Sequence, residues 1–136
     1  DTYFEVKRLH RNEGFDFQGV RLQTVQTVHY MDGYEIVPSY GLIWKTPDGR
    51  NIFLTTDTQF CPNQIRDFYR TADVIFHDCE TGQPPTGIHA HFDELSTLPV
   101  DLRKKMWLYH YRDRVLPDAV AAGFAGFVKA GQVFEF

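Results

Sequence analysis

The chain has 136 residues, of which 43% are hydrophobic and 24% charged, so it can bury a core and is too apolar to be disordered. Its net charge of -4 argues against the basic surface of a nucleic-acid-binding protein, although divalent cations in a site could still attract phosphates. We expect one globular domain over residues 1–136, with an aromatic core, because phenylalanine alone contributes 12 residues.

The first half of the chain shows the alternation of polar and apolar residues that is typical of strands. Strands are predicted over residues 2–9, 20–28, 40–44 and 52–56. Gly14 and Gly19 indicate a tight hairpin or bulge, and KTPDGRN, residues 45–51, indicates a second hairpin. The segment between, residues 30–39, is predicted as a loop with turns at Gly33 and Pro38. Together these elements form an antiparallel meander.

The second half alternates helices with strands. Pro62 can begin a helix, in which Ile65, Phe68 and Tyr69 give one apolar face. The apolar run 72–76 predicts a buried strand that ends at His77 and Asp78. Further along the chain we predict short helices after His91 and from Pro99, a strand over 107–110, a helix over 117–124 and two small strands within 127–136.

Two cysteines, Cys61 and Cys79, have no CxxC spacing, which is the usage of a reducing compartment. We interpret them as partly buried thiols, with a metal contact from Cys79 as the alternative. No apolar run approaches the roughly twenty residues of a membrane span, and no apolar leader precedes the first predicted strand. A cytoplasmic protein that does not contact the membrane is therefore expected. The start at Asp1, directly in a strand-like pattern, reads like the middle of a longer sequence.

Polar residues follow the predicted strands in a repeated way. His29, Asp57, His77 and His110 each stand at the end of a separate apolar strand. A single histidine at such a place is more often a hydrogen-bonded structural residue than a ligand, but neighbouring strands of one sheet bring their ends together in space. Imidazole and carboxylate groups suit zinc, iron or manganese. The pattern predicts a metal site assembled by the fold.

The order of these segments resembles a known family. TVHYMDGYEIVPSYGLIW, IFLTTDTQF, ADVIFHDCE, GIHAH and WLYHY follow one another as in the C-terminal half of a metallo-β-lactamase-fold hydrolase of the ribonuclease Z and phosphodiesterase branch. The resemblance covers almost the whole chain. It implies an α/β fold that is half of an αββα sandwich, with a β-meander followed by alternating helices and strands.

The resemblance also implies roles for individual residues. His29 would bind one metal, Asp57 would bridge two metals, and His110 would bind the other metal. His77 and Asp78 resemble a pair that orients a ligand through a hydrogen bond, and His77 is also a catalytic candidate. The HAH string offers His89, which we favour slightly, or His91 as the residue that faces the substrate and protonates the leaving oxygen.

As cofactors the resemblance implies two divalent metal ions, with zinc expected and manganese or iron as alternatives. The substrate would be a phosphodiester, such as a cyclic nucleotide or an RNA end, and the protein would be a homodimer. The HxHxDH string that supplies most ligands in this family does not occur in the chain. Three matched ligands are too few for two metals, so an N-terminal half of the same fold is expected as a separate segment or chain.

Two other functions stay open at this point. One is a non-hydrolytic di-iron protein of the same fold that binds oxygen or carries out redox chemistry. The other is a catalytically inactive interaction module. The basic residues Arg103, Lys104, Lys105 and Arg112 could contact phosphates but are better interpreted as a solvated helix face. The aromatic segment from Tyr30 to Tyr40 could stack on a base or cover the core.

Overall fold

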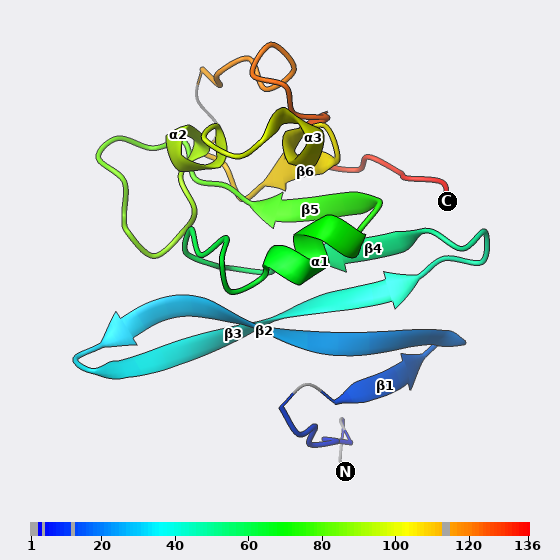
Figure 1. The fold of residues 1–136 in the computed structure, drawn as a ribbon. Helices are drawn as coiled ribbons and strands as arrows, with labels where there is room; N and C mark the ends of the chain where they lie inside the picture. Colours follow the sequence, from blue (N-terminus) through cyan, green and yellow to red (C-terminus); the bar gives the residue numbers. More distant parts are fainter. Residues whose placement is uncertain (1–2, 4, 12, 113–114) are drawn as a thin grey trace.

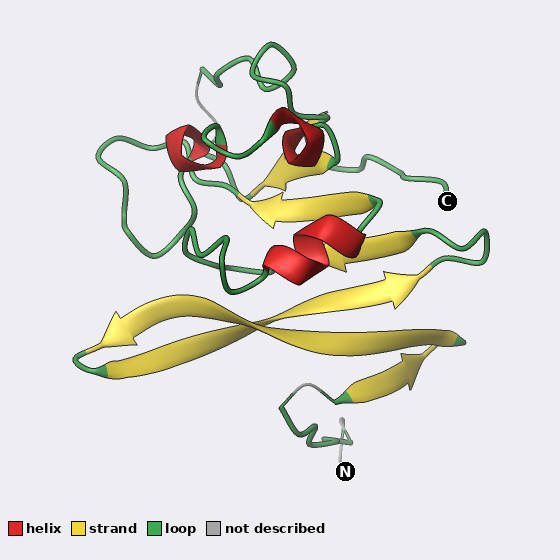
Figure 2. Cartoon of the chain, in the orientation of Figure 1, coloured by secondary structure: helices red, strands yellow, loops and turns green. Residues whose placement is uncertain are grey.

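The computed structural model describes residues 3, 5–11, 13–112 and 115–136, which form one seven-stranded sheet and three short helices (Figures 1 and 2). The strands follow one another across the sheet in chain order. The elements are β1 (Gly14–Phe17), β2 (Val20–Asp32), β3 (Glu35–Lys45), β4 (Asn51–Leu54), α1 (Arg66–Thr71), β5 (Val74–Asp78), α2 (Phe92–Leu95), α3 (Val100–Arg103), β6 (Met106–Tyr109) and β7 (Gly126–Phe127).

The sheet is mixed, and its first part is the antiparallel meander that the sequence predicts. Strands β1 to β4 pair antiparallel through hairpins, whereas β4 to β7 pair parallel. Parallel neighbours need crossover connections, and α1, α2 and α3 lie in those connections. The parallel strands β4, β5 and β6 therefore end at the same edge of the sheet, where the polar residues that follow them can meet.

The hairpin of β2 and β3 is longer than predicted. Residues 30–39 belong to strands, and the turn is confined to Gly33 and Tyr34, so the predicted loop is wrong. Pro38 does not make a turn, because it lies opposite Val28 at the place where the register shifts. Figure 1 shows this hairpin projecting beyond the rest of the sheet.

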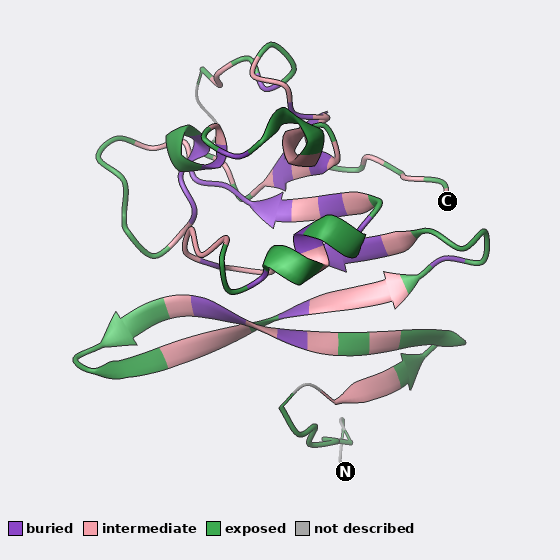
Figure 3. Ribbon diagram, viewed as in Figure 1, coloured by how far each residue is buried: buried purple, intermediate pink, exposed green. Residues whose placement is uncertain are grey.

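The hydrophobic core lies between the sheet and the helices. Ile65 and Tyr69 are each 1% exposed and pack with Phe53 of β4 and Ile75 of β5, which confirms the predicted apolar face of this segment. The helix itself begins at Arg66, four residues after Pro62. Figure 3 shows burial concentrated in β4, β5 and β6, while the end of the β2–β3 hairpin is exposed.

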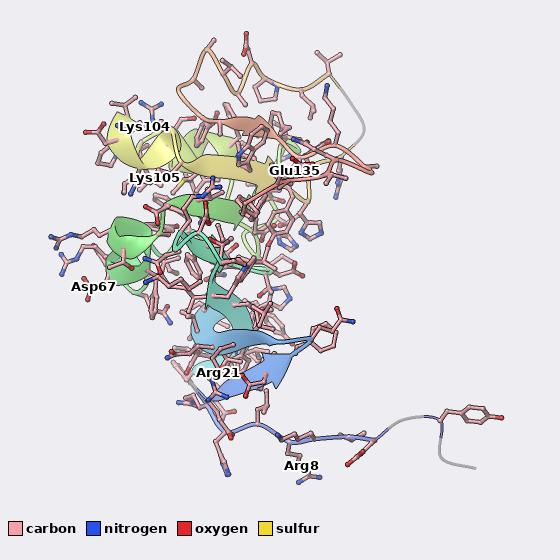
Figure 4. All side chains as sticks on the ribbon, turned by 90° about the vertical axis from the view of Figure 1, so that its right-hand side faces the viewer. Arg8, Arg21, Asp67, Lys104, Lys105 and Glu135 are labelled. Carbon is pink, nitrogen blue, oxygen red and sulfur yellow. The ribbon has the colours of Figure 1, made fainter. Side chains whose placement is uncertain are left out.

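The opposite face of the sheet is covered in part by the last residues of the chain. The Phe134 ring lies 4.8 Å from the Phe76 ring and 5.1 Å from the Trp107 ring, between centroids. Figure 4 shows the two sides of the sheet, with Asp67 and Lys104 on the helical side and Glu135 away from the helices.

Three predicted elements differ from the structure. No strand is present over the described part of residues 2–9, and positions 2 and 4 lie outside the described residues. In the predicted helix 117–124, residues 119–123 form turns, because Gly123 takes a φ of 86° and leaves too few residues after Pro117 for a stable helix. Of the two strands predicted within 127–136, the structure has β7, Gly126–Phe127, and the described residues after it form no further strand.

None of the helices in the described residues has the length and apolarity that crossing a membrane requires.

Candidate metal centre

Four side chains converge beyond the ends of β4, β5 and β6. Asp57, Asp78, His89 and His110 each offer a carboxylate oxygen or ring nitrogen, and these four atoms lie within 4.8 Å of one another. Asp57 follows β4, Asp78 ends β5, and His110 follows β6. His89 comes from the loop between β5 and α2. Residues that are up to 53 positions apart in the chain thus share one site because parallel strands end together.

The turn after β4 presents Asp57 to solvent. Thr56 takes a φ of 54°, a left-handed conformation that is uncommon for a β-branched residue. The Thr56 hydroxyl lies 2.9 Å from the Ser39 hydroxyl, which ties this turn to β3. As a result the Asp57 side chain is 47% exposed and its carboxylate lies 3.5 Å from Nδ1 of His110.

Asp78 has no exposed side-chain area and accepts three hydrogen bonds. Its Oδ2 accepts from the backbone N–H of Thr58 at 2.8 Å and from His89 Nδ1 at 2.7 Å. Its Oδ1 accepts from His110 Nδ1 at 2.9 Å. A carboxylate only accepts, so both imidazoles donate from Nδ1 and keep Nε2 for another partner. Asp78 therefore acts as the common anchor of two histidines, an arrangement that orients metal-binding imidazoles in proteins.

The two anchored imidazoles are in direct contact. The centroids of the His89 and His110 rings lie 4.4 Å apart at an interplanar angle of 85°. His110 takes a φ of 70°, again left-handed, which turns its side chain back toward Asp78. The side chain of His89 is 14% exposed and that of His110 is 45% exposed, so both rings reach solvent from the same edge.

His29 stands next to this cluster because of an irregularity in β2. The pairing of β2 with β3 shifts between Val28 and Tyr30, so His29 is the extra residue of a β-bulge, which redirects a side chain. Its ring lies 5.8 Å from that of His89, between centroids. Its Nδ1 is buried and has no hydrogen-bond partner among the described residues. A buried imidazole nitrogen without a partner fits a metal ligand, so the residues present suit a divalent ion.

His77 and His91 lie outside the cluster. His77 is fully buried, with Nε2 bonded to the Tyr69 hydroxyl and Nδ1 2.6 Å from the Asp78 carbonyl oxygen. Burial lowers the pKa of His77 below its ordinary value. His91 is the N-cap of α2, since its Nδ1 accepts from the Asp93 N–H at 3.2 Å and its Nε2 lies 3.1 Å from the Gly82 carbonyl oxygen. Both rings are thus used inside the protein.

Cys79 and the basic residues near α3, which the sequence also suggested as site residues, lie away from the cluster. Cys79 is fully buried in the hydrophobic core, where desolvation raises the pKa of its thiol, so its side chain does not face the cluster. Among the basic residues, Lys104 pairs with Asp101 and Lys105 donates to the Ala72 carbonyl oxygen at 2.8 Å. Figure 4 shows both lysines at the helical side of the sheet. Arg103 and Lys105 are half-buried and donate to the carbonyl oxygens of Ala122 and Ala72, so these basic residues do not form one solvated helix face.

Sequence reasoning missed the threonines that surround Asp57. The Thr55 hydroxyl accepts the backbone N–H of Asp78 at 3.0 Å, and the Thr58 N–H is one of the donors to the Asp78 carboxylate. Both residues are fully buried. The signal that could have found them is the TTDT string, in which small hydroxyl side chains flank an aspartate at a strand end.

The fold and the site together define a metallo-β-lactamase-fold protein. The chain superposes on the metallo-β-lactamase fold protein YhfI from Bacillus subtilis with a TM-score of 0.60 at 15% identity, covering 89% of this chain and 50% of YhfI. It also superposes on a diphosphatase from the PhnP family with a TM-score of 0.65 at 21% identity, covering 97% of this chain and 49% of that protein.

The chain belongs to the Anti-Pycsar protein Apyc1 family, whose profile it matches over residues 1–134. It is 31% identical over 120 residues to the Anti-Pycsar protein Apyc1 of Paenibacillus harenae, covering 85% of this chain and 45% of the relative. The fold expected from sequence is confirmed, whereas the family is a different one from the ribonuclease Z branch that the segments resemble.

The chain spans about half the length of the curated relatives that it matches, 45% of the protein from Paenibacillus harenae and 52% of the one from Saccharibacillus brassicae. The residues of the candidate metal centre therefore correspond to only part of each relative.

Proposed function

We propose that this chain carries part of the active site of a metal-dependent phosphodiesterase that hydrolyses cyclic nucleotides. The observation that carries the proposal is the shared anchor, in which buried Asp78 holds both His89 and His110 by Nδ1 next to the exposed carboxylate of Asp57. Membership of the Anti-Pycsar protein Apyc1 family favours hydrolysis of a cyclic nucleotide. The phosphodiester substrate that the sequence predicts favours the same reaction. A negative net charge favours a small nucleotide over long RNA, because RNA binding requires several basic contacts.

In this proposal His110, Asp57 and His29 hold divalent metal, and zinc is the expected ion, with manganese or iron as alternatives. When bound, such an ion lowers the pKa of a coordinated water and offsets the charge of the phosphodiester. Asp78 keeps the Nδ1 proton on His110, so that Nε2 of this ring presents its lone pair. His29 contributes the buried Nδ1 that lacks a partner among the described residues.

His89 is the proposed proton donor to the departing oxygen. Its Nδ1 is engaged by Asp78, so a proton on Nε2 faces away from the anchor. The carboxylate of Asp78 stabilises the positive charge of a doubly protonated imidazole, and transfer from Nε2 would release the alcohol of the opened nucleotide. His77 and His91 have no part in this proposal, since both their ring nitrogens already have partners.

Two divalent ions need more ligands than these three residues offer, because each metal takes about four. We therefore propose that a further segment of the same fold supplies the remaining ligands. A homodimer is part of the same proposal, supported by the exposed end of the β2–β3 hairpin, where Met31, Tyr34 and Ile36 are 50%, 103% and 52% exposed. A cytoplasmic location is supported by the two free cysteines, Cys61 and Cys79.

The test is metal content and turnover of the intact protein carrying Asp57→Ala or His110→Ala. Each variant loses a proposed metal ligand, so its zinc affinity should fall by more than the roughly 10–100-fold that loss of a ligand's hydrogen-bond partner costs. Hydrolysis of a 3′,5′-cyclic nucleotide should be lost as well. Asp67→Ala is the matched control, because Asp67 is an exposed carboxylate on α1, away from the cluster.

The alternatives give different results in the same experiment. Iron in the purified protein without turnover of any phosphodiester would favour the redox protein. Unchanged metal content and unchanged activity in both variants would favour an interaction module.

A further inference from the structure

The loop that carries His89 is irregular and depends on a few anchors. It connects β5 to α2 and forms a wide excursion at the edge of the sheet (Figure 1). Residues 83–88 are exposed, and Pro84 and Pro85 have no backbone N–H to donate. Contacts with residues outside the loop therefore contribute to the conformation of residues 81–89.

Glu80 closes the two ends of this loop with its backbone. Its N–H donates to the Ala90 carbonyl oxygen at 2.9 Å, and its carbonyl oxygen accepts from the Phe92 N–H at 3.0 Å. These two bonds form a parallel bridge between Glu80 and His91. The bridge sets where the loop starts and ends, but it does not fix the residues in the middle.

The side chain of Glu80 holds the middle of the loop through Thr86. Oε1 accepts the Thr86 backbone N–H at 2.7 Å, and Oε2 accepts the Thr86 hydroxyl at 2.8 Å. Glu80 is 8% exposed and pairs with no cation among the described residues, so both of its recorded side-chain partners belong to Thr86. Hydrogen bonds to an ionised, poorly solvated carboxylate are about twice as strong as neutral ones.

The neighbouring contacts carry this restraint to His89. The amide of Gln59 donates to the Gly87 carbonyl oxygen at 2.6 Å, and the Ala90 N–H donates to the Thr58 carbonyl oxygen at 2.7 Å. Thr86 and Gly87 precede His89 by three and two positions. The backbone on both sides of His89 is thus held in place. The His89 ring is therefore preorganised for its hydrogen bond to Asp78.

We infer that Glu80 is a positioning residue that holds His89 at the reaction centre through its two hydrogen bonds to Thr86. The inference rests on the proposed function, in which His89 donates a proton to the departing oxygen. If the bonds to Thr86 are lost, residues 82–88 gain freedom and the Nε2 proton of His89 is in place for a smaller fraction of the time. The metal ligands Asp57 and His110 are on other segments and keep their positions.

The choice of substrate separates positioning of His89 from general damage. The alkoxide that leaves a cyclic nucleotide is a strong base and needs a proton, whereas nitrophenolate is a stable anion and leaves without one. Loss of the anchor should therefore slow hydrolysis of a 3′,5′-cyclic nucleotide and leave hydrolysis of bis(4-nitrophenyl) phosphate nearly unchanged.

The experiment compares Thr86→Val with Thr86→Ser in the intact protein. Valine has the shape of threonine without the hydroxyl, and serine keeps the hydroxyl. We expect Thr86→Val to lower kcat for the cyclic nucleotide about tenfold, part of the effect of a general acid, with little change for the nitrophenyl ester. Thr86→Ser should resemble the parent protein on both substrates, and Glu80→Leu, which removes both acceptor oxygens, should reproduce the selectivity of Thr86→Val.

A second measurement does not depend on activity. In the metal-free protein, two amides report the anchor: that of residue 86, which donates to Glu80, and that of Ala90, which donates to the Thr58 carbonyl oxygen. Both should exchange hydrogen faster in Thr86→Val than in Thr86→Ser, because the loop opens more often. Equal exchange in the two variants would overturn the inference, and so would an equal loss of activity on both substrates. If the parent protein hydrolyses neither substrate while the exchange rates differ as expected, the proposed function fails and the anchor itself is confirmed.

Discussion

At the scale of single residues, the site depends on one buried carboxylate. Asp78 accepts from Thr58, His89 and His110 and has no exposed side-chain area. Three hydrogen bonds offset the cost of burying the carboxylate, and they fix the proton of each imidazole at Nδ1. A single side chain thus sets the orientation of both rings. The two acceptor oxygens of Asp78, and not only the volume of its side chain, are needed for this.

Asp78→Asn tests this role, since the amide keeps the shape and replaces one acceptor oxygen by a donor. A donor would then face the N–H of Thr58 or of a histidine, which costs about 1–3 kcal/mol in the free energy of unfolding. We expect zinc affinity to fall about 10–100-fold, because the imidazoles lose their common partner. Zinc titration and chemical unfolding measure the two effects. Asp67→Asn should change neither, and an Asp78→Asn protein with parental zinc affinity would contradict the assignment.

His77 gives a prediction about pH and stability. Burial lowers its pKa in the folded state, so the unfolded chain binds the proton more readily. The stabilising contribution of neutral His77 is therefore present above the unfolded pKa of about 6.5 and is lost as pH falls below it. We expect the free energy of unfolding to decrease from pH 7.5 to 5.5, and to decrease less in His77→Gln. Equal decreases in the two proteins, measured by urea unfolding, would show that other groups account for the pH dependence.

At the scale of elements, the close approach of β3 to the end of β4 sets where Asp57 lies. A Cβ atom added to Gly41 of β3 would lie 2.6 Å from the Leu54 carbonyl oxygen and 3.0 Å from that of Thr55. Both are backbone atoms, so the end of β4 would have to move. The glycine thus permits the turn through Thr55 and Thr56 that leads to Asp57.

Gly41→Ala should therefore destabilise the protein by about 1–3 kcal/mol, as overpacking does, and weaken zinc binding as well. Gly82→Ala is a suitable comparison, because its added Cβ would be 4.0 Å from the nearest neighbouring atom, the ordinary distance of van der Waals contact. Thermal unfolding and zinc titration compare the stability and the zinc affinity of the two variants. Similar behaviour of the two alanine variants would mean that β4 tolerates displacement.

At the scale of the whole molecule, the part of the sheet formed by β4, β5 and β6 is apolar on both faces. One face packs on Ile65, Tyr69 and the helices, and the other presents Phe76 and Trp107, which contact Phe134. The last residues of the chain thus contribute to the second face although they form no strand there. This explains why alternating apolar residues in the sequence resemble a strand: Phe134 and Phe136 pack while Val133 and Glu135 are exposed.

Phe134→Ala should lower the free energy of unfolding by about 2–4 kcal/mol, somewhat less than a fully buried phenylalanine, because its ring is partly buried. Val133→Ala removes apolar atoms from a side chain that is 80% exposed and should cost less than about 0.5 kcal/mol. Chemical unfolding of both variants measures the difference. If the two substitutions cost the same, the contacts of Phe134 with Phe76 and Trp107 do not stabilise the fold.

The sequence by itself determined the antiparallel meander, the alternation of helices and strands that follows it and the polar residues at the strand ends. Local periodicity shows where a strand ends, and parallel strands that end together bring Asp57, Asp78 and His110 into one place. The same reasoning could not decide which face of the sheet His77 occupies. Successive strand residues point to opposite faces, so His77 and Asp78 could not both face the site, and packing against Tyr69 decided which one entered the core.

Only the tertiary structure decided the remaining features. The bulge at His29 depends on how β3 pairs with β2, and the choice between His89 and His91 depends on which ring caps α2 and which reaches Asp78. The anchor between Glu80 and Thr86 spans an irregular loop with no periodic signal. Such contacts join residues at irregular distances along the chain. Helices and strands repeat with a fixed period that a sequence reveals, whereas a hydrogen bond between loops depends only on which residues the fold brings together.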